Sequence, residues 1–422
     1  MQRLKVNVLL VGSGGREHAI AWKLLQSPLL DRLYVAPGNG GTEEYNVAIG
    51  ATDVGALTRF AREKKCFTVI GPESPLALGL VDSLQSEGLS CFGPTREQAR
   101  LETSKAFAKE FMKSNQIPTA EFEIFKDYKS ALDYCQRKEG NVVIKVDGLA
   151  SGKGVFVCSD LQETVDALKA IFTERLFGDS GNSVVIEEKL LGTEASFIAI
   201  CDGKNALPFG TATDHKRLLN GDRGPNTGGM GAFSPARGFD EKERGYVMET
   251  IVRPAVLKTG FRGFLYAGLM LTERGPRVLE FNARLGDPET QALLLRLDSD
   301  LLQILIEISE KGTESSIADG IEWSPNHSCC VIMCSPGYPS RIKTGSPITG
   351  LEAAEKIPNV LIFHAGTKKD KGRFLTSGGR VLCLTGHGAS LADASNSAYK
   401  AVSLISWEGE NHRSDIGRAV PI

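Results

Sequence analysis

An acid, an amide and an arginine stand at alternate positions in the second half of the chain, at Glu280, Asn282 and Arg284. Successive side chains of a β-strand point to opposite faces, so these three would project together from one face of a strand. Carboxylate and amide oxygens are hard ligands that suit a Mg²⁺ ion bridging phosphate groups. A guanidinium beside them could neutralise a phosphoryl group during its transfer. The spacing therefore predicts a site for metal-assisted phosphoryl transfer.

A β-hairpin would present these side chains. Residues 263–271 form one apolar strand, the stretch 279–289 closes a second strand, and residues 274–276 are expected to make the turn between the two strands. Residues 286–289, which read Gly-Asp-Pro-Glu, add two more acids on a constrained turn. An ordinary amphipathic strand with a polar outer face is the weaker interpretation.

Two lysines lie at positions where a bound anion would offset an otherwise unfavourable positive charge. Lys145 lies inside the β-branched run 142–146, and burying an unpaired ammonium is costly, so it either reaches water or meets an anion. The glycine-rich turn 147–154 is one residue short of a Walker A loop and has Gly154 where Ser or Thr should be. The composition of this turn is typical of a flap that closes over phosphates and equally of an ordinary hairpin loop. Lys105 opens a helix, where a phosphate would relieve its conflict with the dipole and solvent exposure is the alternative.

A glycine-rich loop follows the first strand at residues 12–18, where helix N–H groups attract a phosphate. A dinucleotide fingerprint would need glycine where Glu17 stands, and the second strand, residues 33–37, lacks the acid that would bind a ribose. A nicotinamide cofactor is therefore disfavoured. A smaller phosphorylated ligand and a purely structural role for the glycines stay equally open.

Two further polar segments could contact ligands. The apolar strand that begins at residue 184 turns polar at residues 187–189, so an adenine could lie against its backbone. Residues 213–231 form a long basic, glycine-rich stretch, and loops of this length are usually functional or disordered. His215 within it is expected to supply a hydrogen bond rather than act as a base.

The elements around these motifs predict a chain in several parts. Apolar runs ending in glycine alternate with helical patterns up to about residue 102, which predicts a parallel α/β sheet with ligands at the carboxyl ends of its strands. Residues 122–187 alternate strands and helices, and residues 188–325 hold the hairpin. Short strands beyond residue 326 predict a small β-rich module.

Composition excludes several classes of protein. The 422 residues carry a formal net charge of −2, which gives no general attraction to nucleic acid or to an anionic membrane. No apolar run is long enough to cross a bilayer. Nine scattered cysteines without metal-site spacing predict reduced thiols in a cytoplasmic protein. Without a Gly-x-Ser-x-Gly elbow, hydrolysis through a covalent intermediate has little support.

Four motifs carry a resemblance that runs over essentially the whole chain. They are Gly-Ser-Gly-Gly-Arg-Glu-His at 12–18, Asp-Gly-Leu-Ala-Ser-Gly-Lys-Gly at 147–154, Pro-Asn-Thr-Gly-Gly-Met-Gly-Ala at 225–232 and Leu-Gly-Asp-Pro-Glu-Thr-Gln at 285–291. The chain resembles the phosphoribosylamine–glycine ligase (glycinamide ribonucleotide synthetase) family of the ATP-grasp superfamily. The last two motifs together are highly specific for it.

The resemblance implies a fold and a reaction. The fold is a multidomain α/β fold with an N-terminal parallel doubly wound sheet, a central two-part ATP-grasp α+β fold and a small C-terminal β-rich domain. These would span residues 1–103, 104–325 (the smaller lid part at about 122–187) and 326–422. The reaction is the ATP-dependent joining of glycine to 5-phosphoribosylamine through glycyl phosphate, in de novo purine synthesis. A monomer in the cytoplasm is expected, without nucleic-acid or membrane partners.

The resemblance also implies residue roles. ATP would be bound by Lys105, Lys145, Gly148, Ser151, Gly152, Lys153, Gly154, Glu187, Glu188, Leu190 and Glu194. The other substrates would be bound by Gly14, Gly15, Arg16, Glu17, Asp214, Lys216, Asp287, Pro288 and Glu289. Glu280 and Asn282 would bind Mg²⁺ or Mn²⁺, and Arg284, Lys216 and Asp214 would be catalytic. Glu289 is also the candidate for a second metal ligand, because Leu269 and Leu271 on the preceding strand are apolar.

Three alternatives remain. An ATP-grasp ligase or carboxylase for another purine intermediate or for bicarbonate would share the nucleotide residues and differ at residues 213–235. A nicotinamide-dependent oxidoreductase would use the N-terminal sheet, although the missing glycine and acid oppose it. A non-catalytic nucleotide-binding regulator would not need the complete set of lysines, acids and arginine.

Overall fold

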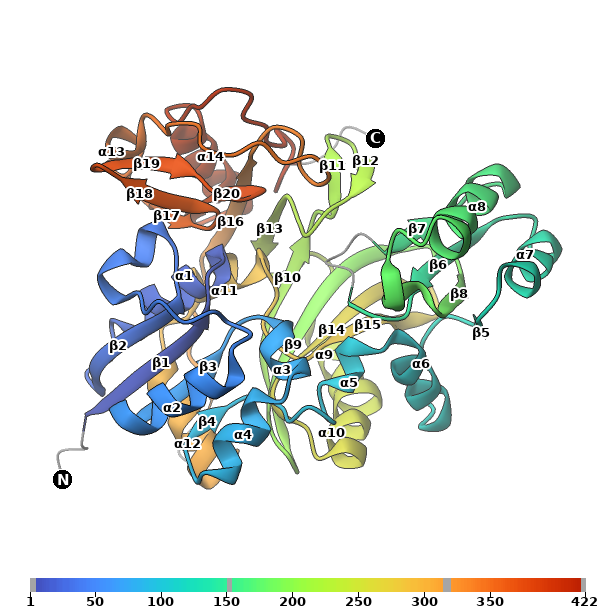
Figure 1. Cartoon of the computed structure of the whole chain (residues 1–422), viewed down its shortest axis with the longest axis horizontal. Helices are drawn as coiled ribbons and strands as arrows, with labels where there is room; N and C mark the ends of the chain where they lie inside the picture. The colour runs from blue at the N-terminus through green and yellow to red at the C-terminus, as the bar shows by residue number, and fades with distance from the viewer. Residues whose placement is uncertain (1–4, 150–153, 314–319, 419–422) are drawn as a thin grey trace.

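The computed structural model describes residues 5–149, 154–313 and 320–418. Its framework consists of a four-stranded N-terminal sheet, a second four-stranded sheet and an eight-stranded sheet. In Figure 1 the blue N-terminal sheet and the second four-stranded sheet lie on opposite sides of the long strands of the eight-stranded sheet. The prediction of a multidomain α/β fold with a parallel N-terminal sheet is confirmed.

The N-terminal sheet is parallel, with strand order β2-β1-β3-β4. Val8 and Leu10 of β1 enter one apolar core and Leu9 and Val11 enter another, as the alternation of a strand requires. Both faces are therefore covered, as parallel sheets need. The elements are β1 (Val6–Gly12), α1 (Gly15–Leu24), β2 (Leu30–Pro37), η1 (Gly40–Tyr45), α2 (Val54–Lys64), β3 (Cys66–Ile70), α3 (Glu73–Ala77), α4 (Leu80–Ser86) and β4 (Cys91–Phe92).

The second four-stranded sheet, the lid sheet, is antiparallel in the order β5-β8-β6-β7. Helices α5 (Arg100–Thr103) and α6 (Lys105–Ser114) lead into it. It has its own core, which includes Ile144, Val184 and Ile186. Its elements are β5 (Phe122–Phe125), α7 (Tyr128–Arg137), β6 (Val142–Val146), β7 (Val155–Val157), α8 (Leu161–Leu168), η2 (Lys169–Thr173), η3 (Gly178–Gly181) and β8 (Val184–Glu188).

The eight-stranded sheet has the order β15-β14-β9-β10-β13-β16-β20-β17. Its first strands are β9 (Thr193–Asp202), β10 (Ala206–Asp214), β13 (Gly231–Ser234), β14 (Arg262–Thr272) and β15 (Gly275–Asn282). Helices α9 (Glu241–Val247), η4 (Met248–Val252), α10 (Arg253–Thr259), α11 (Glu289–Arg296) and α12 (Leu301–Lys311) accompany them.

The C-terminal strands extend this same sheet. β16 (His327–Cys334) pairs with β13 and is followed across the sheet by β20 (Arg380–Gly388) and β17 (Val360–His364). The edge of β13 would otherwise present unpaired backbone groups. Helices α13 (Leu351–Ala354) and α14 (Leu391–Val402) and the hairpin β18 (Thr367–Asp370) and β19 (Arg373–Thr376) complete this part. A small β-rich module of short strands was expected here, and the structure joins its strands to the central sheet.

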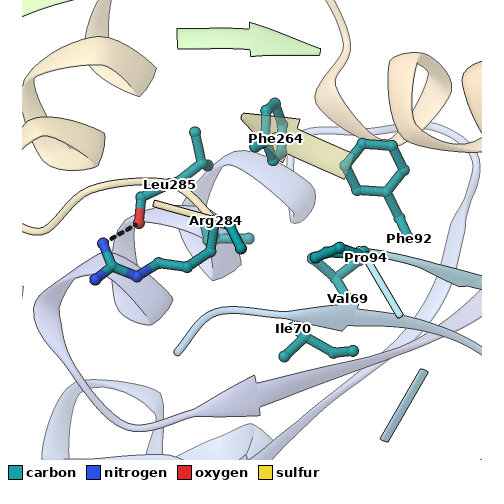
Figure 2. Close-up of a pocket in the computed structure, with 10 residues that line it drawn as sticks. Val69, Ile70, Phe92, Pro94, Phe264, Arg284 and Leu285 are labelled. Carbon is teal, nitrogen blue, oxygen red and sulfur yellow. Dashed lines mark hydrogen bonds between the residues drawn. The ribbon is translucent and has the colours of Figure 1, made fainter. Parts of the chain in front are cut away.

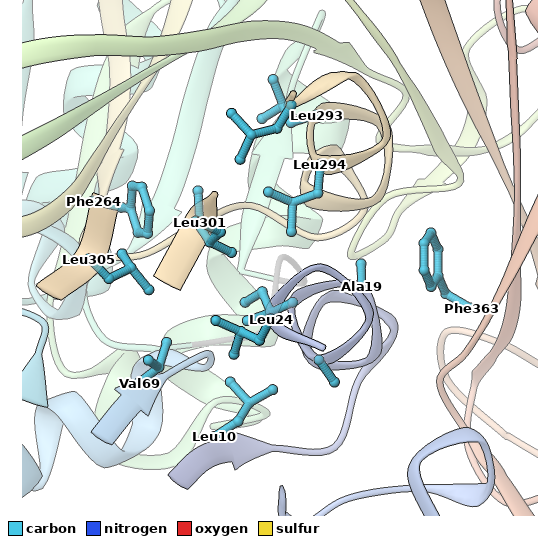
Figure 3. Packing of buried hydrophobic residues seen from close by; sticks show 14 of the residues in the cluster. Leu10, Ala19, Leu24, Val69, Phe264, Leu293, Leu294, Leu301, Leu305 and Phe363 are labelled. Carbon is cyan, nitrogen blue, oxygen red and sulfur yellow. The ribbon is translucent and has the colours of Figure 1, made fainter. Parts of the chain in front are cut away.

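One apolar core ties the N-terminal sheet to the rest of the chain. Leu10, Leu24 and Val69 lie in the same cluster as Phe264 of β14 and leucines of α11 and α12 (Figure 3). Phe363 of β17 closes the cluster beside α1. The carboxyl ends of β1 and β3 are thereby fixed against the start of α11. Within the described ranges, the chain has no helix long and apolar enough to cross a membrane.

Two buried histidines meet where α1 packs against β17. The backbone N–H of His364 donates to Nδ1 of His18 at 2.8 Å, and Nδ1 of His364 lies 3.0 Å from Thr367 Oγ1. Burial lowers the pKa of His18 to about 4. Burial, and then the neighbouring His18, lower the pKa of His364 to about 3. Both rings therefore stay neutral in the folded chain at pH values where the unfolded chain protonates them.

The free energy of unfolding should decrease as the pH falls from about 6.5 toward these lowered values, because the unfolded chain then binds more protons than the folded chain. Thermal unfolding across this range measures the slope. The double variant His18→Gln/His364→Gln should lose less stability than the unaltered chain over the same range. Equal slopes in the two proteins would show that the histidines do not cause the effect.

Candidate active site

The strand β15 brings Glu280 and Asn282 to one face, as the alternation predicted. They pair across the hairpin with Gly268 and Tyr266 respectively. The turn differs from the expected residues 274–276: Thr272 pairs with Gly275, so Glu273 and Arg274 form the turn and Gly275 begins the second strand. Gly275 has φ 96°, a conformation that favours glycine.

Glu280 lies among cations. Burial alone would raise its pKa, but the ammonium groups of Lys216, Lys145 and Lys105, together with Arg284, hold the pKa at about 2. The nearest contact is Lys216, whose Nζ is 3.6 Å from Glu280 Oε1. Glu280 is therefore ionised throughout the neutral range, as a metal-binding carboxylate must be.

Helix α6 positions Lys105 at its first residue. Ser104 caps the helix by accepting a hydrogen bond from Phe107 N at 3.1 Å. Asp147, at the end of β6, accepts from Ser104 Oγ at 2.9 Å and Ala106 N at 2.8 Å, which anchors the helix start to the lid sheet. Burial lowers the pKa of Lys105, and Glu280 partly offsets this. The sequence had not marked Asp147 for this role, although an acid after a strand was visible.

Lys145 meets an anion supplied by the protein. Its Nζ lies 2.9 Å from Glu187 Oε1 and donates to Leu279 O at 2.8 Å. Lys145 therefore touches β15 at the residue before Glu280. Of the two alternatives drawn from the sequence, contact with an anion is the one observed.

The described ends of the glycine-rich turn, Gly148 and Gly154, continue from strands β6 and β7 of the lid sheet. Lys145 pairs with Val155 across the β6–β7 hairpin. Gly148 approaches Ser180 so closely that an added Cβ would lie 2.4 Å from the Ser180 hydroxyl. Gly154 O accepts a hydrogen bond from Val146 N at 2.9 Å. The predicted ATP contacts Ser151, Gly152 and Lys153 lie outside the described residues.

The segment expected beside the adenine continues from β8. Glu187 is buried, with both carboxylate oxygens engaged by lysines. Glu188 accepts from Glu121 N at 3.0 Å, and Leu190 is half-buried. Glu194, at the start of β9, is exposed and has Lys216 Nζ at 3.6 Å from its Oε2.

Lys216 thus stands between Glu194 and Glu280, one residue beyond His215 and close to Asp214. Burial would lower the pKa of Lys216, but Asp214, Glu194 and Glu280 raise it well above its usual value. Burial raises the pKa of Asp214 to about 8 against the opposing effect of Lys216. The stretch 213–231 is not an open loop: it contains the hairpin β11 (Arg217–Leu219) and β12 (Arg223–Asn226).

The N-terminal glycine loop lies against the Gly-Asp-Pro-Glu turn. Gly14 N donates to Glu17 Oε2 at 2.6 Å, and Arg16 Nε lies 2.5 Å from Glu17 Oε1. Arg16 also donates to Leu285 O at 3.0 Å. Glu17 therefore occupies the N–H group that a phosphate on this loop would use. An added Cβ on Gly15 would lie 2.8 Å from Gln291 Nε2, so this glycine permits close packing.

The acids of the Gly-Asp-Pro-Glu turn also have protein partners. Asp287 Oδ2 lies 2.9 Å from Arg380 Nη2, and Asp287 Oδ1 accepts from Gln291 at 2.8 Å. Pro288 precedes the first residue of α11. Glu289 is buried and accepts from Tyr266 Oη at 2.8 Å and Ser196 Oγ at 3.3 Å. The turn therefore lies beside the N-terminal loop, and Glu289 faces the β9–β14 side.

Arg284 lies beyond the end of β15 and faces the N-terminal part of the chain. Its Nη2 is 2.6 Å from Glu102 Oε1 and its Nε is 3.3 Å from Glu73 Oε2. Figure 2 shows the guanidinium pointing away from Phe264 and Phe92 and donating to Leu285 O, at 3.2 Å. The apolar cavity beside it measures about 10 Å³, which is room for one water molecule and not for a nucleotide.

Glu102 and Glu73 were missed by the sequence analysis. Glu102 also accepts from Ala283 N at 2.7 Å, and burial raises its pKa to about 7 despite Arg284. Burial likewise opposes ionisation of Glu73, but Arg284 lowers the pKa of Glu73. Glu73 starts α3 just after β3, so an acid at the carboxyl end of a parallel strand was the available signal.

A metal ion would need ligands beyond the protein. Among the residues described, no group of three or more His, Cys, Asp or Glu side chains could hold one. Glu280 and Asn282 offer two oxygen ligands on one face, and phosphate oxygens of a nucleotide would supply others. The donor set therefore fits a hard divalent cation bound together with a nucleotide.

A lid sheet beside the end of an antiparallel sheet, with lysines converging on Glu280 of β15, defines an ATP-grasp protein. The fold agrees with solved structures. The biotin carboxylase domain of Hydrogenobacter thermophilus 2-oxoglutarate carboxylase has a TM-score of 0.73 over 97% of this chain and 92% of that chain. Its sequence identity is 16%, so the likeness shows the fold alone.

Three family models of phosphoribosylglycinamide synthetase match the chain in succession. The N domain matches residues 6–102, the ATP-grasp (A) domain residues 103–290 and the C domain residues 328–419. The chain belongs to the phosphoribosylglycinamide synthetase family, and the resemblance predicted from the four motifs is confirmed. Membership of this family excludes the nicotinamide-dependent oxidoreductase.

Individual relatives agree over their full lengths. The phosphoribosylamine–glycine ligase of Salmonella typhimurium (strain LT2) is 47% identical over 98% of both chains. That of Vibrio vulnificus (strain CMCP6) is 44% identical over 98% of both chains. The crystal structure of phosphoribosylamine–glycine ligase from Thermotoga maritima has a TM-score of 0.83 at 34% identity, covering 97% of this chain and all of that chain.

Proposed function

We propose that this chain catalyses the ATP-dependent ligation of glycine to 5-phospho-D-ribosylamine. The products are glycinamide ribonucleotide, ADP and phosphate, and the reaction is the second step of de novo purine biosynthesis. The observation that carries the proposal is 47% identity over 98% of both chains to a phosphoribosylamine–glycine ligase. The cluster of lysines and acids at β15 supports phosphoryl transfer as the first step.

The reaction has two steps. A carboxylate oxygen of glycine attacks the γ-phosphorus of ATP, the bond to the bridging oxygen breaks, and ADP leaves with glycyl phosphate formed. The amine of 5-phosphoribosylamine then attacks the acyl carbon, loses a proton, and expels phosphate as the amide forms. Phosphoryl transfer of this kind needs positioning and charge neutralisation more than covalent help from the protein.

The ATP site lies between the lid sheet and β15. Lys105 and Lys145 hold the phosphates, and the turn at residues 148–154 covers them. The backbone of residues 187–190 takes the adenine, with Leu190 against the ring, and Glu194 holds the ribose hydroxyls. The convergence of Lys105 and Lys145 on Glu280 supports this placement.

Glu280 and Asn282 hold Mg²⁺ or Mn²⁺ together with the ATP phosphates. Such an ion, when bound, offsets charge on the phosphate oxygens. Arg284 stabilises the transferring phosphoryl group and the acyl phosphate. Because Arg284 is paired with Glu102 and Glu73, its guanidinium is held in place by carboxylates rather than by substrate.

The acceptor site adjoins the ATP site, because Lys216 lies between Glu194 and Glu280. Asp214 and Lys216 line it together with the turn Asp287, Pro288 and Glu289. Asp214 and Lys216 lie close together in this site, and burial raises the pKa of Asp214 to about 8 against the opposing effect of Lys216. The phosphate of 5-phosphoribosylamine lies near Gly14 to Glu17, where Arg16 contributes charge and Glu17 orders the loop.

The glycyl phosphate step can be tested with glycine that carries labelled oxygen in its carboxylate. If the carboxylate attacks the γ-phosphorus, one labelled oxygen ends in the released phosphate and the other stays in the amide. Mass spectrometry of both products gives the result. Label absent from the phosphate would contradict an acyl phosphate.

The proposal also includes the oligomeric state, the cellular location and the domain bounds of the enzyme. We propose that it acts as a monomer in the cytoplasm on small-molecule substrates. Its parts are residues 1–103, 104–325 with the lid at about 122–187, and 326–422. The pairing of β13 with β16 in the eight-stranded sheet supports a rigid connection between residues 104–325 and residues 326–422.

A further inference from the structure

Lys109 is a buried lysine to which the proposed mechanism gives no role. It lies one turn after Lys105 on α6, so the two side chains share a face of the helix. Only 2% of Lys109 is exposed. Burial lowers its pKa to about 8, with Glu187 opposing the shift. A buried ammonium persists only where the surrounding structure compensates its charge.

The compensation comes from Glu187, which two lysines share. Lys109 Nζ is 3.0 Å from Glu187 Oε2, and Lys145 Nζ is 2.9 Å from Glu187 Oε1. Lys109 also donates to Thr119 Oγ1 at 2.6 Å. The Thr119 hydroxyl in turn donates to Val278 O at 2.6 Å. Glu187 on the lid sheet is thereby joined to α6 and to β15.

The two lysines hold Glu187 in different ways. Lys145 Nζ reaches both Glu187 Oε1 and Leu279 O, and its charge also acts on Glu280. Lys109 Nζ reaches Glu187 and Thr119. Lys145 is therefore the lysine of the pair that lies toward Glu280, and its side chain is the more exposed of the two.

The charges of the cluster favour an anion. Lys105, Lys109 and Lys145 lie around Glu187 and Glu280, and Lys216 and Arg284 add further positive charge beside Glu280. A phosphate that enters would draw Lys145 toward itself. Glu187 would then be left buried with one partner, and an unpartnered buried carboxylate would be costly.

We propose that Lys109 is a positioning residue of the nucleotide site: it offsets the charge of Glu187, which leaves Lys145 free to bind a phosphate. The inference rests on the proposed use of ATP. Without Lys109, Glu187 would compete with the nucleotide for Lys145.

Direct binding of Mg²⁺-ADP, measured by calorimetry without glycine or 5-phosphoribosylamine, tests the competition. Lys109→Met keeps the length of the side chain and removes its charge, so the dissociation constant should increase about tenfold or more. Adding Glu187→Gln should restore most of the lost affinity, because Lys145 then has no buried carboxylate to neutralise. Lys113→Met, an exposed position on the same helix, is the control and should bind as the unaltered chain does.

Unchanged affinity in Lys109→Met would overturn the proposal. So would weakened affinity that Glu187→Gln does not restore, since Lys109 would then act only through the fold. If Lys109→Met does not fold, Glu187→Gln alone decides: affinity equal to or tighter than that of the unaltered chain supports competition, and weaker affinity refutes it. Because binding is measured without the other substrates, a wrong assignment of glycine or 5-phosphoribosylamine would leave the outcome intact.

Discussion

Replacing Arg284 with alanine should reduce kcat by about 100-fold to 1,000-fold, the range for one preorganised contact to charge that develops in the transition state. The affinity for ATP should change much less, because the proposed phosphate contacts of the ground state come from Lys105 and Lys145. Steady-state ADP release gives kcat, and equilibrium binding of Mg²⁺-ATP gives the affinity. Unchanged turnover would remove Arg284 from the mechanism.

Two further variants separate this effect from damage to the fold. Arg274→Ala removes an exposed arginine from the turn of the same hairpin and should leave kcat unchanged. Arg284→Lys keeps a positive charge but cannot engage Glu102 and Glu73 with two nitrogens, so it should recover part of the rate. Thermal unfolding of Arg284→Ala is needed beside the kinetics, because the change leaves Glu102 buried without its cation.

Replacing Glu280 with glutamine should raise the metal concentration required for half-maximal rate by about tenfold or more, since ligand charge governs the affinity for hard divalent cations. The side chain keeps its size and one oxygen but loses a charge that a pKa of about 2 keeps present at neutral pH. Titration of the rate with Mg²⁺ and with Mn²⁺ at saturating ATP measures the shift.

Glu273→Gln is the matched control for this experiment. Glu273 lies on the exposed turn of the β14–β15 hairpin and has no place in the proposed site. Its metal titration should coincide with that of the unaltered chain. A titration of Glu280→Gln that also coincides would show that Glu280 is not a metal ligand.

Local pattern was enough to predict the elements that carry the proposed chemistry. Lys105 opens helix α6, as expected, directly after the cap Ser104. The period-2 spacing that placed Glu280 and Asn282 on one face is borne out by their register in β15. These features depend on residues close together in sequence, so a single chain reveals them.

Pairings between distant residues were not predictable in the same way. The carboxylates that hold Arg284 come from α3 and α5, and the partner of Lys109 comes from β8. An isolated sequence gives the charge of each group but not which charges the fold brings together. The pairing of β16 with β13 could not be predicted for the same reason, because any exposed strand edge could have accepted β16.

One local signal was overlooked. The stretch 213–231 was expected to be a loop because of its glycines and charges, yet Asn220, Gly221 and Asp222 connect the strands β11 and β12. Asn-Gly between short strands is a strong hairpin signal. Arg413, almost fully buried, then holds this hairpin through an ion pair of 2.7 Å to Asp222, which no local pattern indicates.

Substrate-dependent ADP release is the most direct test of the proposed activity. Mg²⁺-ATP is supplied with 5-phosphoribosylamine generated in place, and glycine is added or omitted. The account predicts that ADP is released only when both glycine and 5-phosphoribosylamine are present. Release without glycine, or only with bicarbonate or another amine, would keep the ATP-grasp fold and contradict the assignment of the substrates.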